Sequence, residues 1–309
     1  MVIWVLMLRI ATRKSPLALW QAESVRAQLL IYWPLQKISL IPMVTSGDRW
    51  LQGRLQSVGG KGLFVKELEE ALLDDRADFA VHSMKDVPAA FPAGLGLAAI
   101  CKRDHPLDAF ISLKYKSLND LPIGACIGTS SLRRQSQLLA YRPDLVIHPL
   151  RGNINTRIKK LEAGEFDGII LARAGLERMG LISLITETLS ENIMLPACGQ
   201  GALGIECKLD RVDLIKLLAP LNDLKTAVCI KCEREVNRRL GGNCHVPLAV
   251  YCQYMPDNEL YLQAKIVTPN GDLILSDVKR GPQMQAMSLS EQCANDLLAN
   301  GADELLKNL

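Results

Sequence analysis

Three short segments combine hydroxyl and basic side chains at the point where a predicted strand gives way to a predicted helix. They are Thr12–Ser15, Thr129–Arg134 and Arg151–Asn153, with Arg157 one turn further on. Ligands of open α/β sheets bind at the carboxyl ends of strands, where helix N-termini favour anions. Arginine adds a planar fork that grips a carboxylate or phosphate with two hydrogen bonds. The pattern predicts a site for a ligand with several negative charges; the alternative is that these arginines are solvated or pair with local acidic residues.

Asp86 lies in a further segment of this kind, His82–Pro88 (HSMKDVP), which also follows a predicted strand. A carboxylate beside Lys85 and the basic segments could stabilise a cationic intermediate or carry a proton. The alternative interpretation is an ordinary aspartate of a turn. His82 is interpreted as a packed strand residue rather than a ligand.

Cys244 lies in a glycine-rich loop, Gly241–Pro247 (GGNCHVP), between a predicted helix and a predicted strand. A thiol in such a loop can be exposed, and the nearby Arg238 and Arg239 favour its thiolate form. A structural cysteine is the alternative.

Two glycine motifs lack the context that their familiar ligands require. Gly199–Gly204 matches GxGxxG, but a dinucleotide site needs these glycines to open a helix, and Ala202–Cys207 has the pattern of a strand or turn. Gly59–Gly62 lacks the spacing of a phosphate-binding P-loop. Neither motif supports a nucleotide site.

A CxxC motif, Cys229 to Cys232, lies inside a helical pattern rather than at a helix start, which argues against a thioredoxin-type site. Zinc held by this pair with Cys244 and His245 lacks the second CxxC that would support it. The sequence therefore predicts no metal site.

Alternating strands and helices must position these segments over the first two-thirds of the chain. Strands are predicted at 5–12, 38–45, 78–82, 98–101, 125–129, 145–150 and 168–172, and helices at 17–31, 64–75, from 132 and near 155–163. Ser15 is a plausible N-cap, with Pro16 at the first helical position. The alternation indicates parallel sheet built from βα units, and a restart after the polar segment Lys102–Asp108 indicates two similar α/β domains.

The last third of the chain has a different pattern. A long helix is predicted at 221–240, three strands within 246–279, and a helix at 288–306 that is broken at Asn300–Gly301. The turn at Pro269–Gly271 is a good hairpin signal. Strands and helices that are kept apart suggest a small α+β domain.

Composition excludes several classes of protein. The 309 residues carry 36 Lys and Arg against 33 Asp and Glu, a net charge of +3, with 49% hydrophobic and 22% charged residues. These values argue against disorder and against a general nucleic-acid binder. No window approaches a membrane span, and residues 1–8 lack the features of a signal peptide. Nine cysteines at irregular spacing are then expected to be reduced, in a cytoplasmic protein.

Five motifs in this order resemble the porphobilinogen deaminase (hydroxymethylbilane synthase) family, from about Leu8 to the C-terminal helix. They are Arg9–Trp20 (RIATRKSPLALW), Val58–Glu67 (VGGKGLFVKE), Ala80–Pro88 (AVHSMKDVP), Gly128–Gln135 (GTSSLRRQ) and Leu150–Asn153 (LRGN). The resemblance implies two α/β domains like the halves of a periplasmic binding protein plus a small α+β C-terminal domain. The implied boundaries are residues 1–102 with 200–221, residues 103–199 and residues 222–309.

The resemblance also implies a reaction. Members of the family join four porphobilinogen molecules head to tail into hydroxymethylbilane and release ammonia, in tetrapyrrole (heme) biosynthesis. The primer is a covalent dipyrromethane on a cysteine thioether, a role that falls on Cys244. The family further implies a cytoplasmic monomer, with porphobilinogen as its small-molecule partner and neither nucleic acid nor membrane.

The family's functional residues carry over to this chain by position. Asp86 falls on the catalytic aspartate. The implied cofactor contacts are Ser83, Lys85, Asp86, Thr129, Ser131, Arg133, Arg134 and Arg157. The implied substrate contacts are Arg13, Ser15, Arg151, Arg157 and Arg178. Each pyrrole carries an acetate and a propionate, so an arginine-rich site agrees with the charge pattern above. Asn243 and Arg173 depart from the family pattern.

A second hypothesis is a two-domain polycarboxylate-binding protein without catalysis, since the same fold can serve either function. The C-terminal domain and Cys244 discriminate between the two, because a plain binder needs neither.

Overall fold

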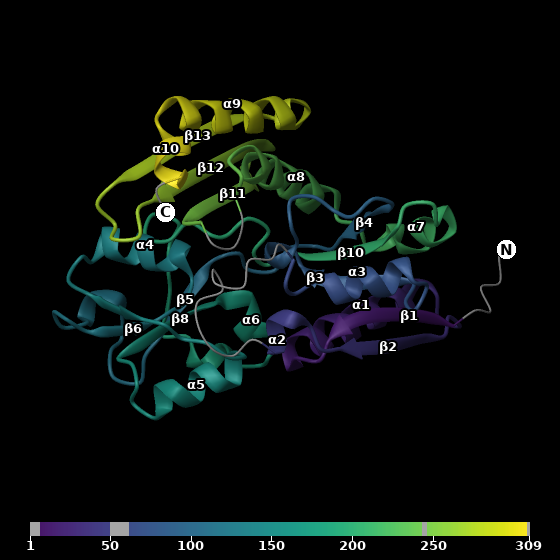
Figure 1. The fold of residues 1–309 in the computed structure, drawn as a ribbon, viewed down its shortest axis with the longest axis horizontal. Helices are drawn as coiled ribbons and strands as arrows, with labels where there is room; N and C mark the ends of the chain where they lie inside the picture. Colours follow the sequence, from purple (N-terminus) through teal and green to yellow (C-terminus); the bar gives the residue numbers. More distant parts are fainter. Residues whose placement is uncertain (1–6, 50–61, 243–245, 308–309) are drawn as a thin grey trace. The chain divides into compact units, whose positions relative to one another are not determined.

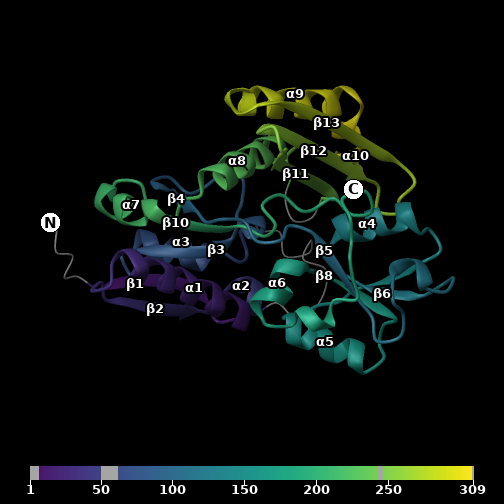
Figure 2. The same ribbon diagram turned by 180° about the vertical axis from the view of Figure 1, so that it is seen from behind.

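The computed structural model describes residues 7–49, 62–242 and 246–307, and the chain divides into two compact units. The first unit comprises Met1–Arg103 and Ala202–Ala227, and the second comprises Asp104–Gly201 and Val228–Leu309. Figures 1 and 2 show the elements of each unit from opposite sides. The three domain boundaries implied by the resemblance remain a prediction.

The first unit contains a five-stranded sheet in the order β2-β1-β3-β10-β4. Its strands are β1 (Leu8–Arg13), β2 (Ile38–Met43), β3 (Phe79–Ser83), β4 (Leu95–Ile100) and β10 (Leu203–Lys208). β1 is parallel to β2 and β3, whereas β10 is antiparallel to β3 and β4. The predicted parallel pairing is found for β1, β2 and β3 but not for β10, which follows the segment Asp104–Gly201 instead of a βα crossover.

The helices of this unit are α1 (Pro16–Tyr32), α2 (Ser46–Arg49), α3 (Lys66–Leu73) and α7 (Val212–Leu218), with the 3₁₀ helices η2 (Met84–Asp86) and η5 (Ala219–Leu221). α1 begins as predicted: the Ser15 hydroxyl accepts a hydrogen bond from the Ala18 amide at 3.3 Å, and Pro16 is the first helical residue. Its buried residues Ala22, Val25 and Leu29 pack on β1 and β3 in the core of the unit.

The second unit contains a sheet in the order β7-β6-β8-β5-β9. Its strands are β5 (Asp108–Ile111), β6 (Cys126–Gly128), β7 (Val146–His148), β8 (Gly168–Ala172) and β9 (Glu187–Thr188). Its helices are α4 (Leu132–Tyr141), α5 (Ile154–Glu162) and α6 (Arg173–Arg178), with η3 (Leu118–Asp120) and η4 (Ile182–Leu184). β6 is parallel to β7 and β8, but β5 is antiparallel to β8 and β9. This sheet is thus also mixed rather than parallel.

A third, antiparallel sheet follows α8 (Leu224–Arg239) in the order β11-β12-β13. Its strands are β11 (Leu248–Tyr254), β12 (Glu259–Val267) and β13 (Ile274–Pro282), followed by η6 (Gln283–Gln285), α9 (Ala286–Ala299) and α10 (Ala302–Lys307). Alternate residues of β12, from Leu260 to Ile266, are buried against α8 and α9. Both views show α9 running along β13 (Figures 1 and 2). The predicted fold class, two α/β sheets and a small α+β part, is confirmed.

The break that separates α9 from α10 lies at Asn300 and Gly301, as predicted.

Among the described helices there is none that combines the length and the apolar composition needed to cross a bilayer.

Candidate active site

A small pocket of about 20 Å³ lies at the carboxyl ends of β1 and β3 in the first unit. Among its lining residues are Arg13, Ser83 and Asp86, all predicted site residues, together with Gln21 and His82. The structure therefore gathers three of the predicted residues at one point of this sheet, as expected for the ligand-binding edge of an α/β fold.

Arg13 is oriented by two partners that sequence reasoning missed. Its Nε lies 3.2 Å from Asp48 Oδ2, a second guanidinium nitrogen also binds that carboxylate, and the guanidinium lies 4.3 Å from the centroid of the Phe64 ring. Burial alone would raise the pKa of Asp48, but the hydrogen bonds and charge of Arg13 outweigh it and lower that pKa. The sequence gives no local signal for Asp48, since 35 residues separate it from Arg13.

Asp86 ends the short helix η2 directly after β3, and its side chain is exposed. Two contacts fix this turn in the protein. The Met84 side chain is buried, and the Met84 amide donates to the Ala202 carbonyl at 3.0 Å. Gln21 Nε2 donates to Ser83 Oγ at 2.9 Å. Asp86 and the exposed Lys85 are therefore presented to solvent by a fixed backbone. Gln21 was not predicted, although a buried glutamine on the sheet-facing side of α1 is a detectable signal.

In the second unit, hydroxyl and amide side chains cap the helices that follow β6 and β7. Ser131 is the N-cap of α4 and its Oγ accepts from the Arg134 amide at 3.4 Å, while the Thr129 hydroxyl accepts from the Ser131 amide at 3.2 Å. Asn153 caps α5 through the Thr156 amide at 2.9 Å. α4 begins at Leu132 as predicted. These caps occupy the same strand-to-helix junctions as the predicted anion contacts.

Arg133 and Arg134 are both buried and share one carboxylate, that of Asp108. Arg133 Nη2 lies 2.7 Å from Asp108 Oδ2, and Arg134 Nη2 lies 2.7 Å from Oδ1. Complete burial disfavours the ionised carboxyl, yet the charges and hydrogen bonds of the two arginines outweigh it and hold the pKa of Asp108 far below its usual value. Two guanidinium groups against one carboxylate leave one positive charge in excess.

Two of the remaining predicted arginines, Arg157 and Arg178, also have backbone or acidic partners. Arg157 Nε donates to the Gly152 carbonyl at 2.8 Å. Arg151, which precedes Asn153 by two residues, is half-buried. Arg178 is buried; its Nε donates to Asp104 Oδ2 at 2.8 Å and its Nη2 to the Gly201 carbonyl at 2.7 Å. Arg178 thereby joins the two segments of the second unit that lead to and from the first.

Some predicted features lie outside the described residues. Cys244, the predicted cofactor attachment residue, is among them, together with Asn243 and His245. The eight described cysteines are free thiols, and the CxxC lies in α8 as expected. Within the described part of the chain, there is no cluster of three or more metal-ligating side chains.

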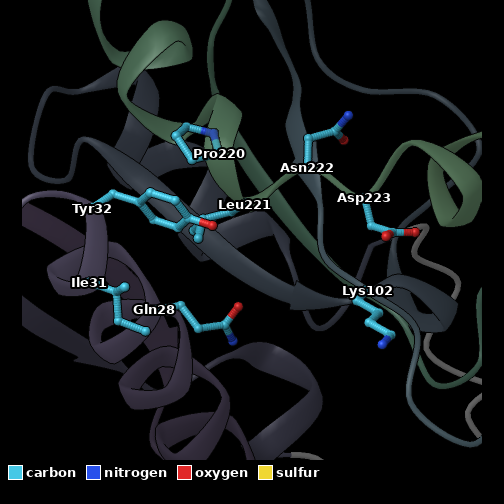
Figure 3. Close-up of a pocket in the computed structure, with 8 residues that line it drawn as sticks. All are labelled: Gln28, Ile31, Tyr32, Lys102, Pro220, Leu221, Asn222 and Asp223. Carbon is cyan, nitrogen blue, oxygen red and sulfur yellow. The ribbon is translucent and has the colours of Figure 1, made fainter.

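A larger pocket, of about 250 Å³, lies elsewhere in the first unit between the end of α1 and η5 (Figure 3). Tyr32, Lys102 and Asp223 are among its lining residues, and it contains none of the predicted site residues. The smaller pocket is the better candidate because it holds the arginine, the aspartate and the strand-end geometry together.

The fold is that of an α/β protein with arginines at the strand ends of two sheets, extended by a small antiparallel sheet with helices. Residues 8–216 match the family model "Porphobilinogen deaminase, dipyromethane cofactor binding domain", and residues 227–299 match "Porphobilinogen deaminase, C-terminal domain". The chain belongs to the porphobilinogen deaminase family.

Curated relatives support the same assignment. The porphobilinogen deaminase of Legionella pneumophila strain Lens is 57% identical over 302 residues, covering 98% of each chain. That of strain Philadelphia 1 is 56% identical over the same share of each chain.

Solved structures with a similar fold include the methionine-binding protein MetQ and a periplasmic substrate-binding protein of an ABC transporter from Coxiella burnetii. MetQ is 13% identical with a TM-score of 0.45, over 70% of this chain and 89% of its own. The Coxiella protein is 15% identical with a TM-score of 0.44, over 72% and 94%.

The residues present fit a dipyrromethane that carries several carboxylates. The Arg133–Arg134–Asp108 group carries one positive charge in excess in the first turn of α4, and positive charge and helix N-termini both attract carboxylates.

Proposed function

We propose that the chain is a hydroxymethylbilane synthase, which joins four porphobilinogen molecules head to tail and releases one ammonia each time. The observation that carries the proposal is the pocket in which Asp86, Ser83 and Arg13 meet at the ends of β1 and β3. An exposed carboxylate beside Arg13 would repel an anionic ligand in a protein that only binds anions. In a reaction that passes through a cationic pyrrole, the same carboxylate stabilises the positive charge.

The dipyrromethane, when bound through a thioether to Cys244, supplies the primer to which substrate rings are added. Its acidic side chains are proposed to contact Ser83, Lys85, Thr129 and Ser131, with Arg133, Arg134 and Arg157. Asp108 keeps the first two of these arginines in place, since each donates to its carboxylate at 2.7 Å.

Asp86 is proposed to be the catalytic residue. Loss of ammonia from porphobilinogen leaves positive charge at the pyrrole nitrogen, and a fixed carboxylate stabilises that charge and holds the nitrogen proton. Because η2 is anchored by Met84 and Ser83, the carboxylate needs little reorganisation as charge develops.

The substrate carboxylates are proposed to bind Arg13, Ser15, Arg151, Arg157 and Arg178. Arg13 is pre-oriented by Asp48 and Phe64, so binding loses less side-chain entropy. We also propose the three domains with the boundaries given above, a cytoplasmic location and a monomeric state.

Intact-mass measurement of the untreated protein tests the proposal. We expect a mass above the sequence mass by one dipyrromethane, and ammonia release with a product that cyclises to uroporphyrin. Cys244→Ser should lose the adduct, while the matched variant Cys126→Ser, which alters a half-buried thiol in β6, should keep it. An unmodified wild type that binds porphobilinogen without releasing ammonia would establish the polycarboxylate-binding alternative instead.

A further inference from the structure

A buried acid–base pair lies directly behind the pocket that contains Asp86. His82 Nε2 is 2.9 Å from Glu206 Oε2, and the two side chains are only 3% and 1% exposed. His82 itself lines the pocket, together with Arg13, Ser83 and Asp86. The pair therefore connects the interior of the first unit to the wall of the candidate active site.

The register of the sheet explains why these two side chains meet. β10 is antiparallel to β3, with Gly204 opposite His82 and Glu206 opposite Ala80. Residues two apart on a strand share a face, so His82 and Glu206 lie on the same side of the sheet as diagonal neighbours. α3 packs over this face, since Ala80 is buried against Leu68 and Leu72.

The same face holds the turn that carries Asp86. A Cβ on Gly204 would lie 2.2 Å from Met84 Sδ, so the glycine makes room for the Met84 side chain beside His82. Met84 also donates its amide to Ala202, the residue before β10. The position of His82 and that of the η2 turn are thus set by the same strand.

Burial makes the pairing obligatory for Glu206. An ionised carboxylate without a partner in the interior is strongly unfavourable. Among the described residues, the two Glu206 oxygens and His82 Nε2 have no hydrogen-bond partner of good geometry, so the 2.9 Å approach of His82 Nε2 to Glu206 Oε2 is an ion-pair contact rather than an aligned hydrogen bond. A third titratable group, Glu69 of α3, faces this pair. Burial raises the pKa of Glu69 to about 7; the charge of Glu206 raises this pKa further, and the charge of His82 lowers it. His82 is thus the ion-pair partner that the described residues give Glu206.

We propose that Glu206 is a positioning residue for the reaction proposed above. Its carboxylate keeps a proton on His82 Nε2 and holds the ring in the pocket wall, and so keeps the Ser83–Asp86 turn in its working position. Glu206 acts through His82 and does not touch the reacting atoms. The inference rests on the proposed function, because it assigns Glu206 to that reaction.

Kinetics of the full-length holoenzyme provide the first test. Glu206→Gln keeps the size of the side chain and removes its charge, and should lower kcat about tenfold or more while KM for porphobilinogen changes less than about twofold. His82→Gln should give a similar loss, and the double variant should lose no more than either single one, since both remove the same contact. The control is Glu70→Gln, an exposed acid of α3 paired with Lys66 at 3.8 Å, which should leave both constants unchanged.

A spectroscopic readout needs no turnover. Ring ¹⁵N shifts of the four histidines, with His82 assigned through His82→Gln, report which nitrogen carries the proton. We expect Nε2 protonation in the wild type and a mixture of tautomers in Glu206→Gln. A His82 ring protonated at Nδ1 alone in the wild type would overturn the inference, even if Glu206→Gln failed to fold.

The outcomes separate the two proposals. An active wild type beside a Glu206→Gln variant with unchanged kcat overturns the role of Glu206 and leaves the proposed function intact. A wild type that releases no ammonia from porphobilinogen overturns the proposed function, and the role of Glu206 in that reaction with it.

Discussion

Arginines at the strand ends of this protein are held by internal carboxylates. Arg13 contacts Asp48, and Arg133 and Arg134 share Asp108. An arginine fixed in this way keeps its direction without a ligand, at the cost of part of its charge. Each of these arginines therefore retains a reduced attraction for a ligand carboxylate.

Asp86→Asn tests the catalytic role of the exposed carboxylate. The amide cannot stabilise positive charge or take a proton, so we expect kcat to fall about a hundredfold or more with KM little changed. Steady-state assay of ammonia release measures both constants. Asp120→Asn is the matched control, since Asp120 is an exposed aspartate that also ends a three-residue 3₁₀ helix. Full activity of Asp86→Asn would remove Asp86 from the mechanism.

Asp108→Asn tests the buried arginine group. Loss of the carboxylate leaves two guanidinium charges buried without compensation, which should lower the free energy of unfolding by about 3–5 kcal/mol at pH 7. The pKa of Asp108 is lowered in the folded state, so its contribution is present above the ordinary aspartate pKa and is lost as pH falls below it.

Urea unfolding at pH 7, 5 and 3 measures this dependence. The gap between wild type and Asp108→Asn should therefore narrow at pH 3. Asp144→Asn is the control, because its partner Arg142 lies in a solvent-accessible pair, and its effect should be far smaller. Equal effects of the two variants would contradict the role given to Asp108.

At the scale of elements, the hairpin between β12 and β13 depends on a glycine. Gly271 has φ of +84°, and a Cβ there would lie 2.4 Å from the Ala140 amide nitrogen of α4. Gly271→Ala should cost about 1 kcal/mol for the left-handed backbone and about 1–3 kcal/mol more for the clash. Gly301→Ala, at φ of +94° with open space around it, should show the first cost alone. Thermal unfolding of both variants measures the difference, and equal losses would exclude the clash.

Local signals predicted the elements with small errors at their ends. β8 lies at Gly168–Ala172 as predicted, and the caps at Ser15 and Ser131 mark the first turns of α1 and α4. These features depend on residues within one turn of each other. The strands β5 and β9 were not predicted; β5 follows a polar segment, and its partners β8 and β9 are distant in sequence.

In the candidate site, too, the residues marked by local patterns were predicted and their distant partners were not. Hydroxyl and basic residues at strand ends marked Arg13, Ser83 and Asp86, which the structure brings into one pocket. Their supporting groups were not: Asp48 lies 35 residues from Arg13, and Glu206 reaches His82 across an antiparallel pair that no local pattern reveals. Contacts between distant segments depend on the order and direction of the strands in the sheet, and a βα pattern in the sequence does not determine that order.

At the scale of the whole molecule, the described residues form three sheets: two lie within residues 8–216, which match the cofactor-binding family model, and one lies within residues 227–299, which match the C-terminal model. The two α/β sheets resemble each other in order, since each has three parallel strands on one side, β2-β1-β3 and β7-β6-β8, followed by an antiparallel strand, β10 or β5. Arg178 donates hydrogen bonds to both Asp104 and Gly201, the first and the last residue of the first segment of the second unit.

The insertion of β10 between β3 and β4 has a consequence for synthesis on the ribosome. β4 has β10 as its sheet neighbour, and Leu203–Lys208 emerges only after the segment Asp104–Gly201 has been made. Until then the nascent chain carries β3 and β4 with unpaired backbone edges, a state that invites association between neighbouring chains. Early translation therefore leaves the first sheet incomplete, and its closure depends on the arrival of β10, which follows the whole segment Asp104–Gly201.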